Sequence, residues 1–330
     1  MDFNAVIKDL KSKKYAPVYL LHGEEPYFID AISGYIEEHV LDETEKGFNQ
    51  TVLYGKDIDV GTLVSHAKRY PMMSERQVVI VKEAQDLKKI DELLPYAENP
   101  LVSTVLVLCY KYKKFDSRLK LAKMIANKGV VFQSDKLYDN KIAEWVSKYV
   151  AEQGLKINPK AAQLIADYLG TDLGKVVNEL SKLVLNLKPG EEITPTHVEQ
   201  NIGISKDYNI FELQSAIAKK DVLKAAQIVN YFNANPKVSP MVLTIGAFYN
   251  YFGKILTYHS LSDKSTAAVA LKVNPFFVKE YELAARNYPA PKVLAIMEML
   301  HVYDLKSKGI NNGSSTDGDL LKELVFKIMH

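Results

Sequence analysis

Residues 18–28 have the layout of a phosphate-binding loop, since an apolar run is followed by a glycine and then by a helical pattern. A working loop of this kind needs several glycines around the phosphates, a lysine that offsets their charge, and a hydroxyl for magnesium. Here the turn reads Gly23-Glu24-Glu25 and is followed by Pro26. Two carboxylates repel a triphosphate, and proline has no N–H to donate. We therefore expect Gly23, Glu24 and Glu25 to form a turn that does not bind nucleotide.

Other catalytic chemistry is also unsupported by residue spacing. The apolar run 77–81 is followed by Lys82-Glu83 and lacks the first acid of the Asp-Glu pair with which an ATPase strand holds magnesium. The 7 histidines are scattered and form no pair with metal-ligand spacing. Cys109 lies inside an apolar run, where a small core residue is expected rather than a nucleophile. We expect no catalytic residue, no metal and no cofactor.

A basic run with interleaved aromatic residues follows the apolar stretch 103–109. Its cations have two alternative interpretations. They form a surface that follows nucleic-acid phosphates, with aromatic rings for stacking, or they lie on a solvated helix face. The cations that we single out as candidate DNA contacts are Lys111, Lys113, Lys114 and Arg118.

The connection before the strand 77–81 carries two adjacent methionines, Met72 and Met73. Pro71 ends the preceding helical pattern, and the strand begins only near Gln77. Two adjacent side chains do not easily point into the same core. The pair is therefore either an exposed, adaptable apolar tip that inserts into a partner or a connection folded onto the sheet edge.

The elements that position these residues change in type along the chain. Apolar, β-branched runs at 17–21, 50–54, 77–81, 103–109 and 129–133 alternate with helical patterns near 28–41, 60–69, 88–97 and 115–127. This alternation predicts a parallel sheet with helices on both faces. After residue 138 every pattern is helical. We predict three domains, an α/β domain at 1–138, a small helical bundle at 139–207 and a larger helical domain at 208–330.

The composition fits a globular protein without a strong overall field. The chain has 330 residues, 47% hydrophobic and 25% charged residues, and a net charge of +2. Its start is amphipathic rather than a secretory signal, no apolar stretch approaches bilayer length, and one cysteine forms no framework of disulfides. We expect a cytoplasmic protein without a membrane span.

Five segments in order resemble one family, the delta subunit of the bacterial DNA polymerase III clamp loader. The similar segments are VYLLHGEEPYFID, YPMMSERQVVIVKEA, LGTDLGKVVNELSKL, NIFELQSAIAKKD and VNPFFVKEYELAARNY. The resemblance implies an ATPase-like (AAA+-type) first domain without a functional phosphate loop, a lid-like helical domain and a helical collar for oligomerisation. It implies a non-catalytic subunit, with ATP hydrolysis supplied by other subunits of a loader that also contains gamma/tau and delta prime.

The resemblance also implies the task, which is to bind the ring-shaped sliding clamp (beta) and open one of its interfaces for loading onto primed DNA. The family does this with two hydrophobic residues that align with Met72 and Met73, flanked here by Arg69, Tyr70 and Pro71. Many relatives have a leucine and an aromatic residue at the pair. Primer–template DNA is a further partner within the assembled loader. The alternatives are an active ATPase with an unusual nucleotide loop and a single-strand DNA-binding module built on residues 111–128.

Overall fold

The structure is a computed structural model that describes residues 1–187 and 190–330. Its contacts divide the chain into two compact units, Met1–Tyr138 and Asp139–His330, each of which is described by itself. The division into three domains stays a prediction, and residues 188 and 189 of the predicted lid-like domain lie outside the described part of the chain.

The first unit is built on a five-stranded sheet in the order β2-β3-β4-β1-β5, in which all neighbouring strands are parallel. The strands are β1 (Val18–Gly23), β2 (Gln50–Tyr54), β3 (Gln77–Lys82), β4 (Thr104–Lys111) and β5 (Val130–Ser134). They coincide with the five apolar runs of the sequence. Because the strands are parallel, all their carboxyl ends meet at one edge of the sheet and all their amino ends at the other.

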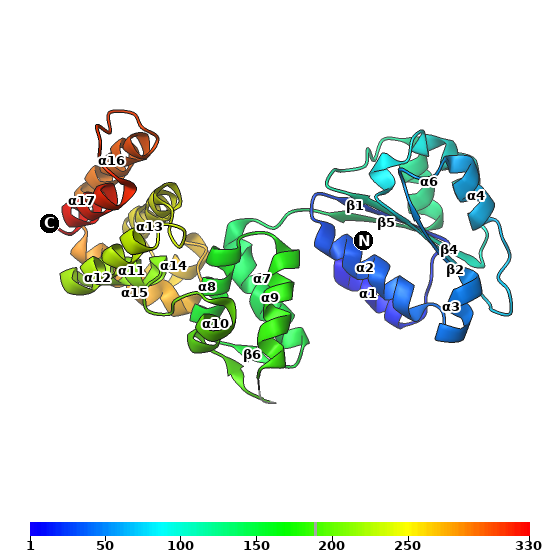
Figure 1. Ribbon diagram of the computed structural model, residues 1–330, viewed down its shortest axis with the longest axis horizontal. Helices are drawn as coiled ribbons and strands as arrows, with labels where there is room; N and C mark the ends of the chain where they lie inside the picture. Colours follow the sequence, from blue (N-terminus) through cyan, green and yellow to red (C-terminus); the bar gives the residue numbers. More distant parts are fainter. Residues whose placement is uncertain (188–189) are drawn as a thin grey trace. The chain divides into compact units, whose positions relative to one another are not determined.

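Helices cover both faces of this sheet (Figure 1). Alternate strand residues supply two cores, so that Leu21 and Ile80 pack toward α1 and α2, whereas Leu20 and Val81 pack toward α4–α6. The fold class predicted from the sequence, a parallel-sheet α/β domain followed by helices, is confirmed. The helices of this unit are α1 (Phe3–Lys11), α2 (Pro26–His39), α3 (Glu43–Asn49), α4 (Val60–Ala67), α5 (Leu94–Glu98) and α6 (Lys120–Lys128).

Two helical segments of the first unit are shorter than their patterns predict. The pattern at 88–97 is a 3₁₀ turn at Ile90–Leu93 followed by α5. The pattern at 115–127 becomes helical only at Lys120, because the Asp116 carboxylate accepts a hydrogen bond from the Arg118 N–H at 2.9 Å. Such a local side-chain-to-backbone bond competes with the helix.

The second unit is mostly helical. Helix α8 begins at an N-cap, Asn158, whose side chain accepts a hydrogen bond from the Lys160 N–H at 2.9 Å. Buried aromatic side chains, among them Phe248 and Tyr288, fill the core of the helices from α11 onward. Of the described residues, none lies in a helix long and apolar enough to cross a membrane. The helices are α7 (Asp139–Glu152), α8 (Pro159–Leu169), α9 (Leu173–Leu185), α10 (Pro195–Ile202), α11 (Ile210–Lys219), α12 (Val222–Ala234), α13 (Met241–Ser260), α14 (Ala267–Ala270), α15 (Val278–Asn287), α16 (Ala290–Ser307) and α17 (Asp317–Met329).

The second unit also contains a small parallel ladder that the sequence patterns did not predict. It pairs β6 (Lys156–Ile157) with β7 (Glu192–Ile193). Strands of two residues are too short to show the alternation by which a strand is read from sequence.

Candidate functional site

The two sites singled out from the sequence lie at opposite edges of the sheet. The connection that carries the methionine pair leads into the first residue of β3, at the amino edge. We call this connection, residues 68–76, the wedge loop. The Gly23-Glu24-Glu25 turn begins at Gly23, the last residue of β1, at the carboxyl edge. The two sites are therefore separated by the length of the strands.

The tip of the wedge loop exposes a set of apolar side chains. Met73 is fully exposed at 103%, Met72 is 62% exposed and Tyr70 is 77% exposed. Arg69 is also exposed, with its guanidinium 3.5 Å from His66 Nδ1, and Pro71 is half-buried. A contiguous apolar tip of this kind on a connecting loop is typical of a surface that binds a partner.

One buried side chain fixes the backbone at this tip. Asn49, the last residue of α3, is only 4% exposed. Its amide oxygen accepts from the Met72 N–H at 2.7 Å, and its amide nitrogen donates to the Met72 carbonyl at 2.9 Å. The same nitrogen donates to the Glu45 carbonyl at 3.2 Å. Both backbone groups of Met72 are thus held by one side chain.

The start of the wedge loop is held by two further buried side chains, Gln77 and Thr104. Gln77 and Thr104 are the buried first residues of β3 and β4. The Gln77 amide nitrogen donates to the Arg69 carbonyl and lies 2.8 Å from the Thr104 hydroxyl. That hydroxyl donates to the Ala67 carbonyl at 2.8 Å. The loop therefore carries adaptable methionine side chains on a fixed backbone.

At the carboxyl edge, the turn after β1 uses its own N–H groups. The Glu24 and Glu25 N–H groups both donate to the Ser134 carbonyl, at 2.8 and 3.3 Å. The Ser134 hydroxyl in turn donates to the Glu25 carbonyl at 2.6 Å. Gly23 has φ +143°, and a Cβ there would lie 1.9 Å from the Ser134 carbonyl oxygen. The backbone donors that a phosphate needs are directed at the protein itself.

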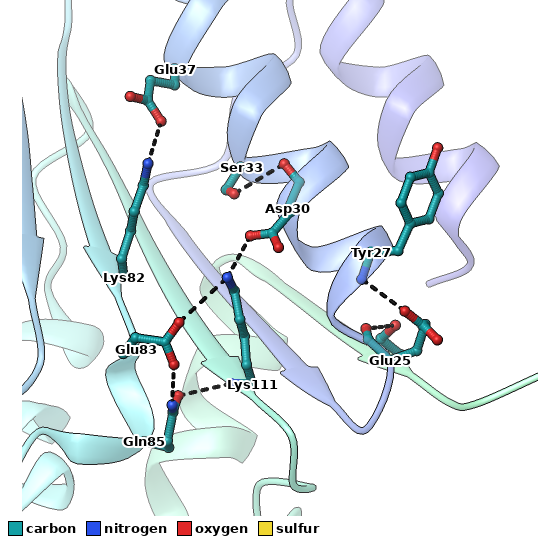
Figure 2. Close-up of polar contacts among 10 residues, drawn as sticks. Glu25, Tyr27, Asp30, Ser33, Glu37, Lys82, Glu83, Gln85 and Lys111 are labelled. Carbon is teal, nitrogen blue, oxygen red and sulfur yellow. Dashed lines mark hydrogen bonds and ion pairs between the residues drawn. The ribbon is translucent and has the colours of Figure 1, made fainter. Parts of the chain in front are cut away.

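Lys111 lies inside an ion-pair network at this edge (Figure 2). Its ammonium group is 2.6 Å from Asp30 and 3.5 Å from Glu83, and its side chain is only 11% exposed. Burial by itself lowers the pKa of Lys111, but the hydrogen bond to Asp30 and the charges of Asp30 and Glu83 outweigh it and raise the pKa. Beside it, Lys82 pairs with Glu37 at 3.2 Å.

Two further groups have buried, unreactive settings. His22 accepts a hydrogen bond at Nδ1 from the Phe115 N–H at 3.1 Å, and burial lowers its pKa, so the ring is neutral at pH 7. Burial raises the pKa of the Cys109 thiol to about 12. A thiol with such a pKa is a poor nucleophile at neutral pH.

The other predicted DNA contacts lie after β4, near the carboxyl edge. Lys114 pairs with Asp135 at 2.7 Å, and Arg118 pairs with Asp116 at 2.8 Å. Lys113 lies over the Tyr110 ring, with its ammonium 5.3 Å from the ring centre. These three side chains are exposed, whereas Lys111 is turned into the network described above. A role in DNA contact stays a prediction for all four.

Sequence reasoning missed Asn49, Gln77 and Thr104, which hold the wedge loop. Asn49 ends a helix and meets Met72 from 23 positions away in the chain. A single asparagine before a strand normally indicates a turn or cap. Only the three-dimensional fold shows that its amide faces a backbone segment, so the sequence held no specific signal for it.

Comparison with known proteins identifies relatives over most of the chain. The chain is 27% identical to the DNA polymerase III subunit delta of Bacillus subtilis, across 97% of this chain and 94% of that protein. It is 24% identical to the probable DNA polymerase III subunit delta of Aquifex aeolicus, across 75% of this chain and 72% of that protein. The solved structure of the Bacillus subtilis DNA clamp loader delta protein (YqeN) matches with a TM-score of 0.54 and 26% identity, covering 99% of both chains.

The family model described as "DNA polymerase III, delta subunit" matches residues 19–135, which include the wedge loop and the turn after β1. The resemblance inferred from the sequence is therefore confirmed, because the family model, the relative from Bacillus subtilis and the solved delta structure all match this chain.

Proposed function

We propose that this chain is a clamp-loader delta subunit that binds the sliding clamp through the wedge loop and opens one interface of the ring. The observation that carries the proposal is the exposed Met72–Met73 pair on a backbone fixed by buried hydrogen bonds. The similarity to a DNA clamp loader delta protein supports the assignment of the partner.

The mechanism is a shift between two states of the ring. Burying two methionine side chains contributes roughly 3–6 kcal/mol in total. If the pocket that receives them is fully formed only in the open ring, this free energy favours the open state over the closed one. Methionine suits the task because its unbranched side chain adapts to irregular pockets. Arg69 and Tyr70, both exposed, flank the pair and extend the contact.

The proposed subunit does not hydrolyse ATP. The Glu24 and Glu25 N–H groups are directed at the Ser134 carbonyl, and the buried Glu25 carboxylate accepts from the Tyr27 N–H at 3.0 Å, so these backbone donors already have acceptors within the protein. In the proposed loader, which also contains gamma/tau and delta prime, other subunits supply hydrolysis. Lys113, Lys114 and Arg118 are the exposed cations available for primer–template DNA within that assembly.

The test is binding of the cognate clamp by the full chain, measured by isothermal titration calorimetry. We expect Met72→Ala/Met73→Ala to weaken binding about 100-fold, because a buried hot-spot pair is truncated. Both side chains are exposed in the free chain, so the urea midpoint should stay unchanged.

A matched control is Val222→Ala/Leu223→Ala, which truncates an exposed apolar pair on α12 of the second unit, 49% and 72% exposed. We expect this variant to bind the clamp like the wild type. Equal binding by the methionine variant and the wild type would place the contact elsewhere. A wild-type chain without affinity for its clamp would overturn the proposed function.

A further inference from the structure

We infer that Asn49 is a positioning residue that fixes the wedge loop in its clamp-binding conformation before the clamp arrives. This inference rests on the proposed function of Met72 and Met73. Asn49 itself touches no partner, since its side chain is 4% exposed and faces the Met72 backbone.

The geometry supports a template rather than an incidental contact. The Asn49 amide makes three hydrogen bonds, accepting from the Met72 N–H and donating to the Met72 and Glu45 carbonyls, at 2.7, 2.9 and 3.2 Å. Through Glu45 the asparagine is tied to α3, and through Met72 the tip of the loop is tied to the asparagine. The end of a helix thus sets the position of a loop tip 23 residues away.

The conformation held in this way is one that a free loop seldom adopts. Met73, next to the fixed residue, has φ +52°, in the left-handed region that is uncommon for residues other than glycine and asparagine. On the other side, the Ser74 hydroxyl donates to the Arg76 carbonyl at 3.0 Å. Without Asn49, we expect Met73 to leave the left-handed region and Met72 to lose its orientation.

The site needs both a hydrogen-bond acceptor and a donor at the end of a short side chain, which asparagine provides. Two substitutions test these groups. Asn49→Asp keeps the acceptor for the Met72 N–H but removes the donor to the Met72 and Glu45 carbonyls. Asn49→Ala removes the donor and the acceptor together. The two variants therefore differ at the acceptor for the Met72 N–H, which Asn49→Asp keeps and Asn49→Ala removes.

Preorganisation of the loop translates into affinity. If only a fraction of the molecules holds the binding-competent loop, the apparent dissociation constant rises by the inverse of that fraction. Loss of both backbone hydrogen bonds at Met72 should reduce the competent fraction to about one tenth, so we expect Asn49→Ala to weaken clamp binding about tenfold. Asn49→Asp should weaken binding at least as much, because its second carboxylate oxygen would face the Met72 and Glu45 carbonyls in a buried position.

The experiment uses the full chain and its cognate clamp, with Asn49→Ala and Asn49→Asp each made in the wild type and in the Met72→Ala/Met73→Ala background. Clamp affinity is measured by calorimetry, and protection of the Met72 amide is measured by hydrogen exchange. We expect protection of that amide to be lost in Asn49→Ala and retained in Asn49→Asp. In the background without methionine side chains, Asn49→Ala should no longer change affinity.

The matched control is Asn209→Ala, which removes another buried asparagine, 8% exposed, that accepts from the Phe211 and Glu212 N–H groups in the second unit. We expect it to lower stability without changing clamp affinity. If Asn49→Ala binds like the wild type while the methionine variant does not, the positioning role is wrong and the proposed function stands. An equal loss in both backgrounds contradicts the inference as well. If the methionine variant binds normally, the clamp contact lies outside the wedge loop, and the positioning role of Asn49 is wrong as well.

Discussion

At the scale of single residues, the buried cation at the carboxyl edge of the sheet is paired with carboxylates of the chain itself. Lys111 meets Asp30 and Glu83, and the Glu83 carboxylate also accepts from Gln85, whose amide oxygen accepts from the Lys111 N–H at 3.0 Å (Figure 2). Ligands of open α/β sheets bind at this edge. Here the largely buried ammonium of Lys111 already has two carboxylate partners.

We predict that Lys111→Met lowers the free energy of unfolding by about 2 kcal/mol, because charge-assisted hydrogen bonds of a largely buried ammonium are lost. The measurement is urea unfolding of the full chain at pH 8. Lys113→Met is the matched control, since Lys113 is exposed and lies over the Tyr110 ring. It should change stability by less than about 1 kcal/mol.

The same pair of proteins gives a pH test with a defined sign. The folded-state pKa of Lys111 is raised, so its contribution is fully present below the unfolded pKa of about 10.4 and is lost as the pH rises through the folded value. The stability difference between wild type and Lys111→Met should therefore be constant from pH 7 to 9 and shrink above that unfolded pKa. A difference that grows at alkaline pH would contradict the ion-pair account.

The sequence identified Lys111 as a candidate DNA contact but did not predict its ion-pair partners. In the sequence it is one cation of a basic run, equivalent to Lys113 and Lys114. The structure separates them, because Lys111 ends β4 facing α2 and Glu83, whereas its neighbours lie beyond the strand. Both partners of Lys111 are distant in sequence, so no local pattern contains this information.

At the scale of elements, the β1–α2 turn depends on a glycine. Gly23 has φ +143°, and an added Cβ would lie 1.9 Å from the Ser134 carbonyl oxygen, with no flexible side chain that could move aside. We predict that Gly23→Ala lowers the free energy of unfolding by at least about 2 kcal/mol. Thermal and urea unfolding of the full chain measure this.

Gly34 offers the matched control because it lies within α2 and an added Cβ meets nothing within 4 Å. Gly34→Ala should leave stability unchanged or raise it by up to about 1 kcal/mol, since alanine favours helix over glycine. If Gly23→Ala were as stable as Gly34→Ala, the close packing of the turn on β5 would be wrong.

Elements were predictable from sequence where burial imposes a pattern. The five strands of the first unit are continuous apolar runs because parallel strands are covered on both faces. The β6–β7 ladder and the 3₁₀ turn at Ile90–Leu93 were not predictable, because each is too short to show a recognisable period. Helix α6 begins later than its pattern predicts, because a hydrogen bond between the Asp116 side chain and the Arg118 backbone competes with the helix.

At the scale of the whole molecule, two compact units share the chain, and the first alone contains the wedge loop and the turn after β1. The length and composition allow two or three domains but do not choose between them. The task of the molecule, as proposed, requires that binding at the wedge loop be coupled to the state of a ring. Binding alone does not establish that coupling, because a ligand with equal affinity for both states shifts nothing.

The most direct test is therefore ring opening. The cognate clamp is labelled with a fluorophore pair across one subunit interface, and energy transfer is followed as the full chain is added. The account predicts that the wild type increases the open fraction, whereas Met72→Ala/Met73→Ala at saturating concentration leaves the ring closed. Tight binding by the wild type without any change in energy transfer, or equal opening by the methionine variant, would contradict it.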